Sequence, residues 1–260
     1  MAREPNRRVQ DTLRLPLMCD DCEERISAWE APFGREMFSK LAAHAALPYP
    51  YGPWMLRFGV SVAWRVLLAH LHLAPDLHVL TERHRKMVPE ALERWRAFMR
   101  GEQPHPGDHQ IHFMSLGLIA NYSGSAPPAG TNWYFTRALE IDVIEGGEHG
   151  ALTYAKMGPA LFVGFISPPS RQEWRGTMLH VRKGQFEGRV EAPMVFGRYL
   201  EDRVRRAIAV GDALSAQQRS KIGEAYRRDP SRVAKSATLS AVRADEAMFG
   251  GDVFSRFTSE

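Results

Sequence analysis

Residues 152–166, LTYAKMGPALFVGFI, form two short runs of β-branched and aromatic residues on either side of Gly158-Pro159. Such runs, bounded by glycine and proline, are typical of neighbouring strands joined by a turn. The same texture is found in three further segments, 111–119, 133–144 and 177–181. The sequence therefore predicts a mostly antiparallel sheet of about five strands within residues 109–184.

Segments with helical periodicity precede and follow the predicted sheet in the sequence. Before it, helices are predicted between residues 54 and 100, with a break near Pro89. After it, helices are predicted over 193–210, 215–228 and 231–248. The order of helices, then strands, then helices favours an α+β fold over a parallel α/β fold.

Residues 47–53, LPYPYGP, have the composition of a loop and mark the predicted boundary between two parts of the chain. The first part, residues 1–46, contains both cysteines and two short predicted helices. The second part, residues 47–260, is the α+β domain.

The chain has 260 residues, of which 44% are hydrophobic and 25% charged, as in an ordinary globular protein. Its longest apolar stretch, residues 54–73, is interrupted by two arginines and two histidines and is typical of a core helix rather than a membrane span. No apolar signal sequence follows the basic N-terminus. Two cysteines three positions apart do not suggest a secreted disulfide framework, so we expect a cytoplasmic protein without a membrane partner.

The formal net charge of +4 is unevenly distributed. Residues 198–235 contain ten Lys or Arg residues against five Asp or Glu residues. This excess is compatible with DNA or RNA as a partner, and a solvated helical face is the competing interpretation.

Residues 17–30, LMCDDCEERISAWE, hold the most specific motif, a single C-x-x-C made by Cys19 and Cys22. Two thiolates at this spacing bind one zinc ion from two sides, and a tetrahedral site needs two further ligands. No second C-x-x-C exists in the sequence. Thioredoxin-like redox chemistry is the alternative for this motif, but the expected βαβ context is absent.

A helix is predicted to begin at the cysteines. Asp20 and Asp21 are good N-cap residues, each with a glutamate three positions later, which is close to a capping box. Ile26 and Trp29 are spaced for one buried face, and Pro32 is expected to end or kink the helix.

Residues 17–30 resemble the L-L-C-x-x-C-E-x-R-x-S-x-W-E segment of a family of uncharacterised bacterial proteins, which themselves resemble HNH-type treble-clef zinc proteins. The segments 162–169, 174–177 and 180–181 are also similar to that family. The resemblance implies a treble-clef remnant, zinc ligation by Cys19 and Cys22, and association with nucleic acid.

The chain departs from the family pattern upstream of Cys19. The first C-x-x-C and the S-H-x-x-P motif of the fuller members have no counterpart in the eighteen preceding residues. An HNH nuclease uses that histidine and a metal for catalysis, so no catalytic residue is carried over. Either a longer form supplies these motifs and is a metal-dependent nuclease, or the protein is a degenerate, non-catalytic descendant.

Two further candidate sites are less specific. Residues 104–112 contain His105, His109 and His112, but two prolines and a glycine favour a turn entering a strand over a metal site. Trp174 and Arg175 either present an indole and a guanidinium for base stacking or form a packed corner of the sheet. The leading hypothesis is a nucleic-acid-associated protein, and the alternative is a protein-interaction or assembly module.

Overall fold

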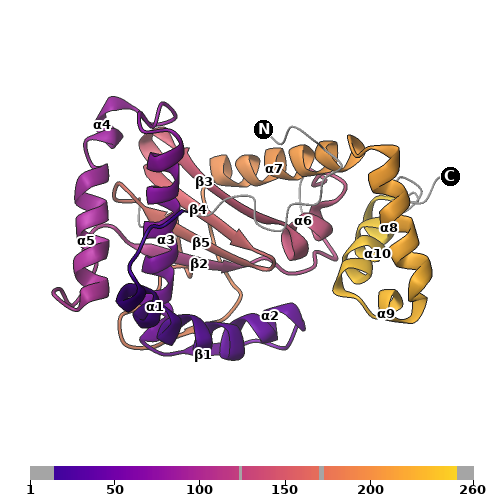
Figure 1. Ribbon diagram of the computed structural model, residues 1–260, viewed down its shortest axis with the longest axis horizontal. Helices are drawn as coiled ribbons and strands as arrows, with labels where there is room; N and C mark the ends of the chain where they lie inside the picture. The colour runs from indigo at the N-terminus through magenta and orange to yellow at the C-terminus, as the bar shows by residue number, and fades with distance from the viewer. Residues whose placement is uncertain (1–14, 123–124, 170–172, 251–260) are drawn as a thin grey trace. The chain divides into compact units, whose positions relative to one another are not determined.

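The computed structural model describes residues 15–122, 125–169 and 173–250 (Figure 1). Its contacts divide the chain into two compact units. The larger unit combines Pro16–Leu116 with Leu139–Gly197, and the smaller unit combines Gly117–Ala138 with the described part of Arg198–Glu260. Residues 1–14 of the predicted N-terminal part lie outside the described residues.

The sheet of the larger unit has four strands in the order β2-β5-β4-β3, and each neighbouring pair is antiparallel. The strands are β2 (Ile111–Ser115), β3 (Leu139–Glu145), β4 (Ala151–Met157) and β5 (Ala160–Phe165). The hairpin predicted from residues 152–166 is β4–β5, in which Tyr154 lies opposite Val163. The predicted α+β fold with an antiparallel sheet is confirmed.

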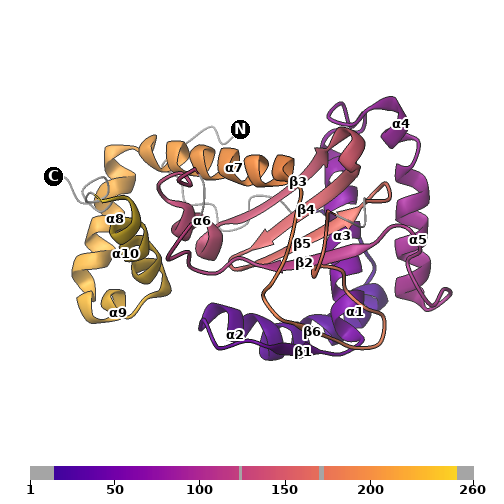
Figure 2. The ribbon, with the colours of Figure 1, turned by 180° about the vertical axis from the view of Figure 1, so that it is seen from behind.

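Helix α3 (Trp54–Leu73) covers one face of this sheet, as Figures 1 and 2 show from opposite sides. Two glycines allow the helix and the sheet to approach closely. A Cβ atom at Gly164 would lie 2.4 Å from the Cβ of Ala63, and one at Gly59 would lie 2.8 Å from the Cγ2 of Ile111. Side chains at these positions would force the two layers apart.

An aromatic cluster joins the helical layer to the sheet. The ring of Phe33 stacks on that of Phe58 with centroids 4.4 Å apart, and Phe162 of β5 lies within 5.5 Å of both. All three side chains are at most 5% exposed. Offset and edge-on ring pairs of this kind add to the free energy gained by burying apolar area.

The opposite face of the sheet is covered by residues that follow β5. Tyr154 and Phe165 point to this face, because side chains alternate along a strand and Thr153 lies on the side of α3. The ring of Trp174 lies 5.1 Å from Phe165 and 5.0 Å from Phe196. The larger unit therefore consists of three layers, with the sheet in the middle.

The cysteine segment leads into a continuous helical stretch. Helix α1 (Asp20–Pro32) passes through a π-helix, η1 (Phe33–Phe38), into α2 (Ser39–Ala42). The α-helix ends at Pro32, as expected, and the chain continues directly as the π-helix η1. Ile26 and Trp29 of α1 are buried, as predicted.

The prediction that Asp20 or Asp21 caps α1 is wrong. The N-cap residue is Cys19, and its side chain makes no capping hydrogen bond. Asp20 and Asp21 already lie in the first helical turn. There their carboxylates interact favourably with the positive end of the helix dipole rather than with individual N–H groups.

Two short helices and a ribbon complete the larger unit. Helices α4 (Glu82–Arg85) and α5 (Val88–Arg100) are separated at the predicted break, and Pro89 occupies the first turn of α5. A two-stranded antiparallel ribbon pairs β1 (Tyr49–Tyr51) with β6 (Gly184–Phe186). The sequence prediction missed this ribbon because β1 lies in the proline-rich loop.

Two strand predictions need correction. The start of the segment 133–144 is helical, because α6 occupies Thr131–Arg137. The segment 177–181 makes only one isolated bridge, between Met178 and His112. Gly176, with φ +71°, immediately precedes this contact.

The smaller unit contains α6, most of α7 (Met194–Asp212), α8 (Ala216–Arg228), α9 (Pro230–Ala234) and α10 (Ala237–Phe249). The helix predicted over 231–248 is two helices, because Ser236 caps α10 by accepting a hydrogen bond from Leu239 N–H. The buried carboxylate of Asp245 accepts hydrogen bonds from the backbone N–H groups of Asn132 and Trp133, both at 2.9 Å. These bonds attach α10 to the first turn of α6. Among the described helices, none has the length and apolarity required to cross a membrane.

Candidate functional site

Cys19 and Cys22 lie at the start of α1 with free, exposed thiols. The pKa of Cys19 is lowered by the N–H group of Cys22 and then by the thiol of Cys22. The same thiol–thiol hydrogen bond raises the pKa of Cys22, because it favours the protonated form of the second sulfur. The two sulfur atoms therefore point toward one another, as they must to share a metal ion.

A tetrahedral zinc site needs four ligands, and the C-x-x-C motif offers two candidate thiols. No group of three or more His, Cys, Asp or Glu side chains within the described ranges is placed to hold a metal ion. The predicted ligands Cys19 and Cys22 thus fit half of such a site.

A cavity of about 420 Å³ opens beside the cysteines, which we call the arginine pocket. Arg25, Arg96 and Arg100 line it together with Trp64 and the two thiols. Two of these cations are already paired, since Arg96 lies 2.7 Å from Glu93 and Arg100 lies 2.8 Å from Glu102. The pocket is therefore only weakly cationic.

The histidines of residues 104–112 do not form a metal site, because their rings have separate partners. His105 Nδ1 accepts a hydrogen bond from Gly107 N–H, and His109 Nδ1 lies 3.2 Å from the carbonyl oxygen of Phe165. His112 Nδ1 lies 2.7 Å from the hydroxyl of Thr177.

A cavity of about 650 Å³ in the larger unit lies between β2, the segment 174–180 and β6. We call it the histidine pocket. Its buried floor consists of Tyr51, His112, Phe113, Trp174, Thr177, Leu179 and Phe186. Its exposed rim includes His105, Asp108, Met178, His180 and Gln185. Segments far apart in sequence, among them the histidine cluster and the Trp174 motif, thus meet in one place.

The hydrogen bonds of His112 define its tautomer. The hydroxyl of Thr177 donates its proton to the carbonyl oxygen of Trp174 at 3.0 Å, so it can only accept from His112. Burial lowers the pKa of His112 from 6.5 to about 3, and the ring is neutral at physiological pH. Its single ring proton is therefore on Nδ1, and Nε2 is a hydrogen-bond acceptor.

Trp174 is packed rather than presented on the surface. Its side chain is 4% exposed, and its ring contacts those of His112, Phe165 and Phe196. Within the described part of the chain, its buried indole N–H has no hydrogen-bond partner. Arg175 is exposed and lies 3.9 Å from Glu191. Of the two interpretations of this motif, the packed corner is correct for the indole.

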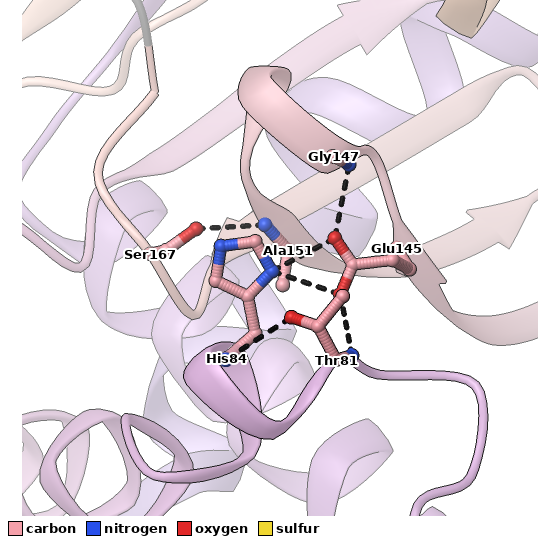
Figure 3. A network of polar contacts seen from close by, with 6 residues as sticks. All are labelled: Thr81, His84, Glu145, Gly147, Ala151 and Ser167. Atoms are coloured by element: carbon pink, nitrogen blue, oxygen red, sulfur yellow. Dashed lines mark hydrogen bonds and ion pairs between the residues drawn. The ribbon is translucent and has the colours of Figure 1, made fainter.

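A polar network that no sequence motif predicts joins α4 to the β3–β4 hairpin (Figure 3). His84 Nδ1 lies 2.8 Å from both carboxylate oxygens of Glu145, which also accepts hydrogen bonds from Thr81 N–H at 2.8 Å and Gly147 N–H at 2.9 Å. We call this set the His84–Glu145 clamp. Burial alone raises the pKa of Glu145, but the hydrogen bonds from Thr81, His84 and Gly147 outweigh it and hold the pKa below 4.5.

Together with Ser167, the clamp contains the residue types of a hydrolytic triad, but they are not arranged as one. In Figure 3 the His84 ring lies between Glu145 and Ser167. Ser167 Oγ accepts a hydrogen bond from Ala151 N–H at 2.7 Å, and both Ser167 and His84 are at most 5% exposed. A nucleophile must be reachable by its substrate, so we interpret the clamp as structural.

The smaller unit presents a cationic surface on α8 and α9. The five exposed cations that we call the basic cluster are Lys221, Arg227, Arg228, Arg232 and Lys235. No ion pair involves them within the described residues. By contrast, Arg205 and Arg206 of α7 are paired with Glu201 and Asp202 one turn earlier.

The chain matches no family model, no curated protein and no solved structure.

Proposed function

We propose that the protein associates with DNA or RNA through the basic cluster. The carrying observation is that residues 221–235 hold five exposed cations against two carboxylates, Glu224 and Asp229. Lys221 and Arg228 are seven positions apart and share one face of α8. When an exposed Lys or Arg side chain binds a phosphate group, condensed counterions are released from the nucleic acid. Because these cations are not in ion pairs with other described residues, no ion pair has to break first.

The proposal covers binding and not hydrolysis. A metal-dependent nuclease needs a bound metal and a base that activates water. The described residues offer the two thiols of Cys19 and Cys22, and the resemblance to HNH-type proteins assigns the base to a motif upstream of them. A longer form would have to contribute that motif.

Fluorescence anisotropy with labelled single-stranded RNA, single-stranded DNA and duplex DNA tests the binding proposal. We expect log Kd to vary linearly with log salt between 50 and 200 mM. The double variant Arg227→Gln/Arg228→Gln should lower that slope by about 1.5, since each lost phosphate contact removes roughly 0.7–0.9.

The matched control is Arg205→Gln/Arg206→Gln, which removes the same charge from a neighbouring helix whose arginines are already paired. We expect a much smaller change in its slope. Equal losses in both variants would show a net-charge effect and no defined surface. Binding without any dependence on salt would overturn the proposal and favour the protein-interaction alternative.

We also propose that Cys19 and Cys22 bind zinc as half of a treble-clef site. The supporting observation is that Cys19 is the N-cap residue of α1, Cys22 lies in its first turn, and the two thiols share a hydrogen bond. Elemental analysis of the purified protein is expected to find zinc, and the variant Cys19→Ser/Cys22→Ser should lose it. Equal zinc in the two proteins, or none in either, contradicts this assignment.

A further inference from the structure

The lining of the histidine pocket contains few charged side chains. None of the residues that line it is lysine or arginine, and Asp108 on the rim is its one carboxylate. Its floor is aromatic, with the rings of Phe113 and Phe186 5.4 Å apart. A volume of about 650 Å³ is ample for a small organic molecule. The lining therefore suits an uncharged, flat ligand better than a phosphate.

Three polar atoms in the lining have unused hydrogen-bonding capacity. His112 Nε2 is an acceptor, and the atom 3.3 Å from it is the amide oxygen of Gln110, which is also an acceptor. Nε2 can accept from the NH2 group of Gln110 after a half-turn of the amide, or from an N–H group of a bound molecule. Trp174 Nε1 is a buried donor without a partner in the described residues.

Tyr51 supplies a further donor. Its hydroxyl oxygen accepts a hydrogen bond from His180 N–H at 3.3 Å, which leaves the hydroxyl proton available. Burial raises the pKa of Tyr51 above 10, so that proton is retained at physiological pH. The floor of the pocket thus offers an acceptor, His112, and a donor, Tyr51, beside aromatic rings.

We propose that the histidine pocket binds a neutral heteroaromatic ligand of the nucleobase or nucleoside class. An N–H group of the base donates to His112 Nε2, and a carbonyl oxygen or ring nitrogen accepts from the Tyr51 hydroxyl. Nucleobases carry such donor and acceptor groups side by side on a flat ring. This site goes beyond the proposed basic cluster, lies in the other unit and does not depend on it.

Two other uses of the pocket fit the geometry less well. General-base catalysis needs a group that takes up a proton near the working pH, and His112 holds its neutral form far below neutrality. Metal binding needs converging ligands, and no group of three His or Asp side chains within the described ranges is so placed.

Calorimetric titration and ligand-observed NMR with adenosine, guanosine, cytidine and uridine test the proposal on the full-length protein. We expect saturable binding of at least one nucleoside, and none of ribose or inorganic phosphate. Tyr51→Phe removes one donor and should weaken binding about tenfold.

A second variant avoids the buried floor. Gln185 is exposed on the rim, so Gln185→Trp should block entry without disturbing folding. His78→Gln, an exposed histidine outside the pocket, should bind like the unmodified protein. The proposal is overturned if no nucleoside binds, or if Tyr51→Phe and Gln185→Trp both bind with unchanged affinity.

Discussion

Glu145 collects three hydrogen-bond donors from places far apart in the chain: Thr81 N–H, the His84 ring and Gly147 N–H. We expect Glu145→Gln to lower the free energy of unfolding by about 2 kcal/mol, since bonds to a charged acceptor are worth more than neutral ones. Urea denaturation measures this change. The matched control Glu148→Gln, on the same hairpin but 91% exposed, should change stability by no more than about 0.5 kcal/mol.

The pH dependence of the clamp has a definite sign. The folded pKa of Glu145 lies below 4.5, so the unfolded chain takes up the proton first as the pH falls. The contribution of the clamp is therefore complete above pH 4.5 and is lost as the pH falls through the folded pKa. If Glu145→Gln and Glu148→Gln lower the free energy of unfolding equally, the His84–Glu145 clamp does not stabilise the fold.

His112 is expected to make stability depend on pH at higher pH values than Glu145 does. Burial lowers its pKa from 6.5 to about 3, so between these values the unfolded chain binds a proton that the folded chain does not. The free energy of unfolding should then fall by about 1.4 kcal/mol per pH unit below 6.5. Denaturation curves at pH 7, 6, 5 and 4 measure the slope. His112→Gln should flatten it, and an unchanged slope would show that the ring is not buried and neutral.

At this scale the sequence predicts only what is local. A helix start at Cys19 and Cys22 is predictable, because their spacing and the acidic residues beside them lie within a few positions. The pairs His84–Glu145 and His112–Thr177 are separated by 61 and 65 residues. No short motif encodes such a contact, so the histidine pocket and the clamp emerge only from the fold.

At the scale of elements, the packing of α3 on the sheet depends on Gly164. Its missing Cβ would lie 2.4 Å from Ala63 and 2.7 Å from Thr153 Oγ1. Gly164→Ala should therefore cost about 1–3 kcal/mol through overpacking. Chemical denaturation gives the value, and the compensating change Ala63→Gly should restore part of it.

Gly34 provides the control for this prediction. A Cβ at Gly34 would meet no atom within 4 Å, and the residue lies in a helical segment. Gly34→Ala is expected to be neutral or stabilising, because alanine is the better helix former. A comparable loss of stability in both variants would mean that the close helix–sheet contact is not the cause.

The elements that the sequence predicted well carry their own periodicity, as β4 and β5 do. One of the two wrong strand predictions has a distant cause. The start of the segment 133–144 is a helix because Asp245, more than one hundred residues later, caps it. The segment 177–181 has strand-like residues but contacts β2 through a single bridge, between Met178 and His112.

At the scale of the whole molecule, the sequence predicts the α+β class, which the structure confirms. The predicted boundary in residues 47–53 followed the local proline content. The smaller unit instead combines Gly117–Ala138 with residues from Arg198 onward, so its core is assembled from two separate stretches. A linear composition shift cannot reveal such an assembly.

Lys156 gives the intact protein a built-in chemical reporter. Lys156 is 1% exposed near the end of β4, and its Nζ donates a hydrogen bond to the carbonyl oxygen of Gly158 at 2.7 Å. The other lysines are exposed: Lys40, Lys86, Lys183, Lys221 and Lys235. A water-soluble acylating reagent should therefore modify these amines within minutes, while Lys156 reacts only when the sheet opens. Peptide mass spectrometry over time would then read the opening rate of the sheet in the unmutated protein, and labelling of Lys156 at the rate of the others would place its amine in solvent.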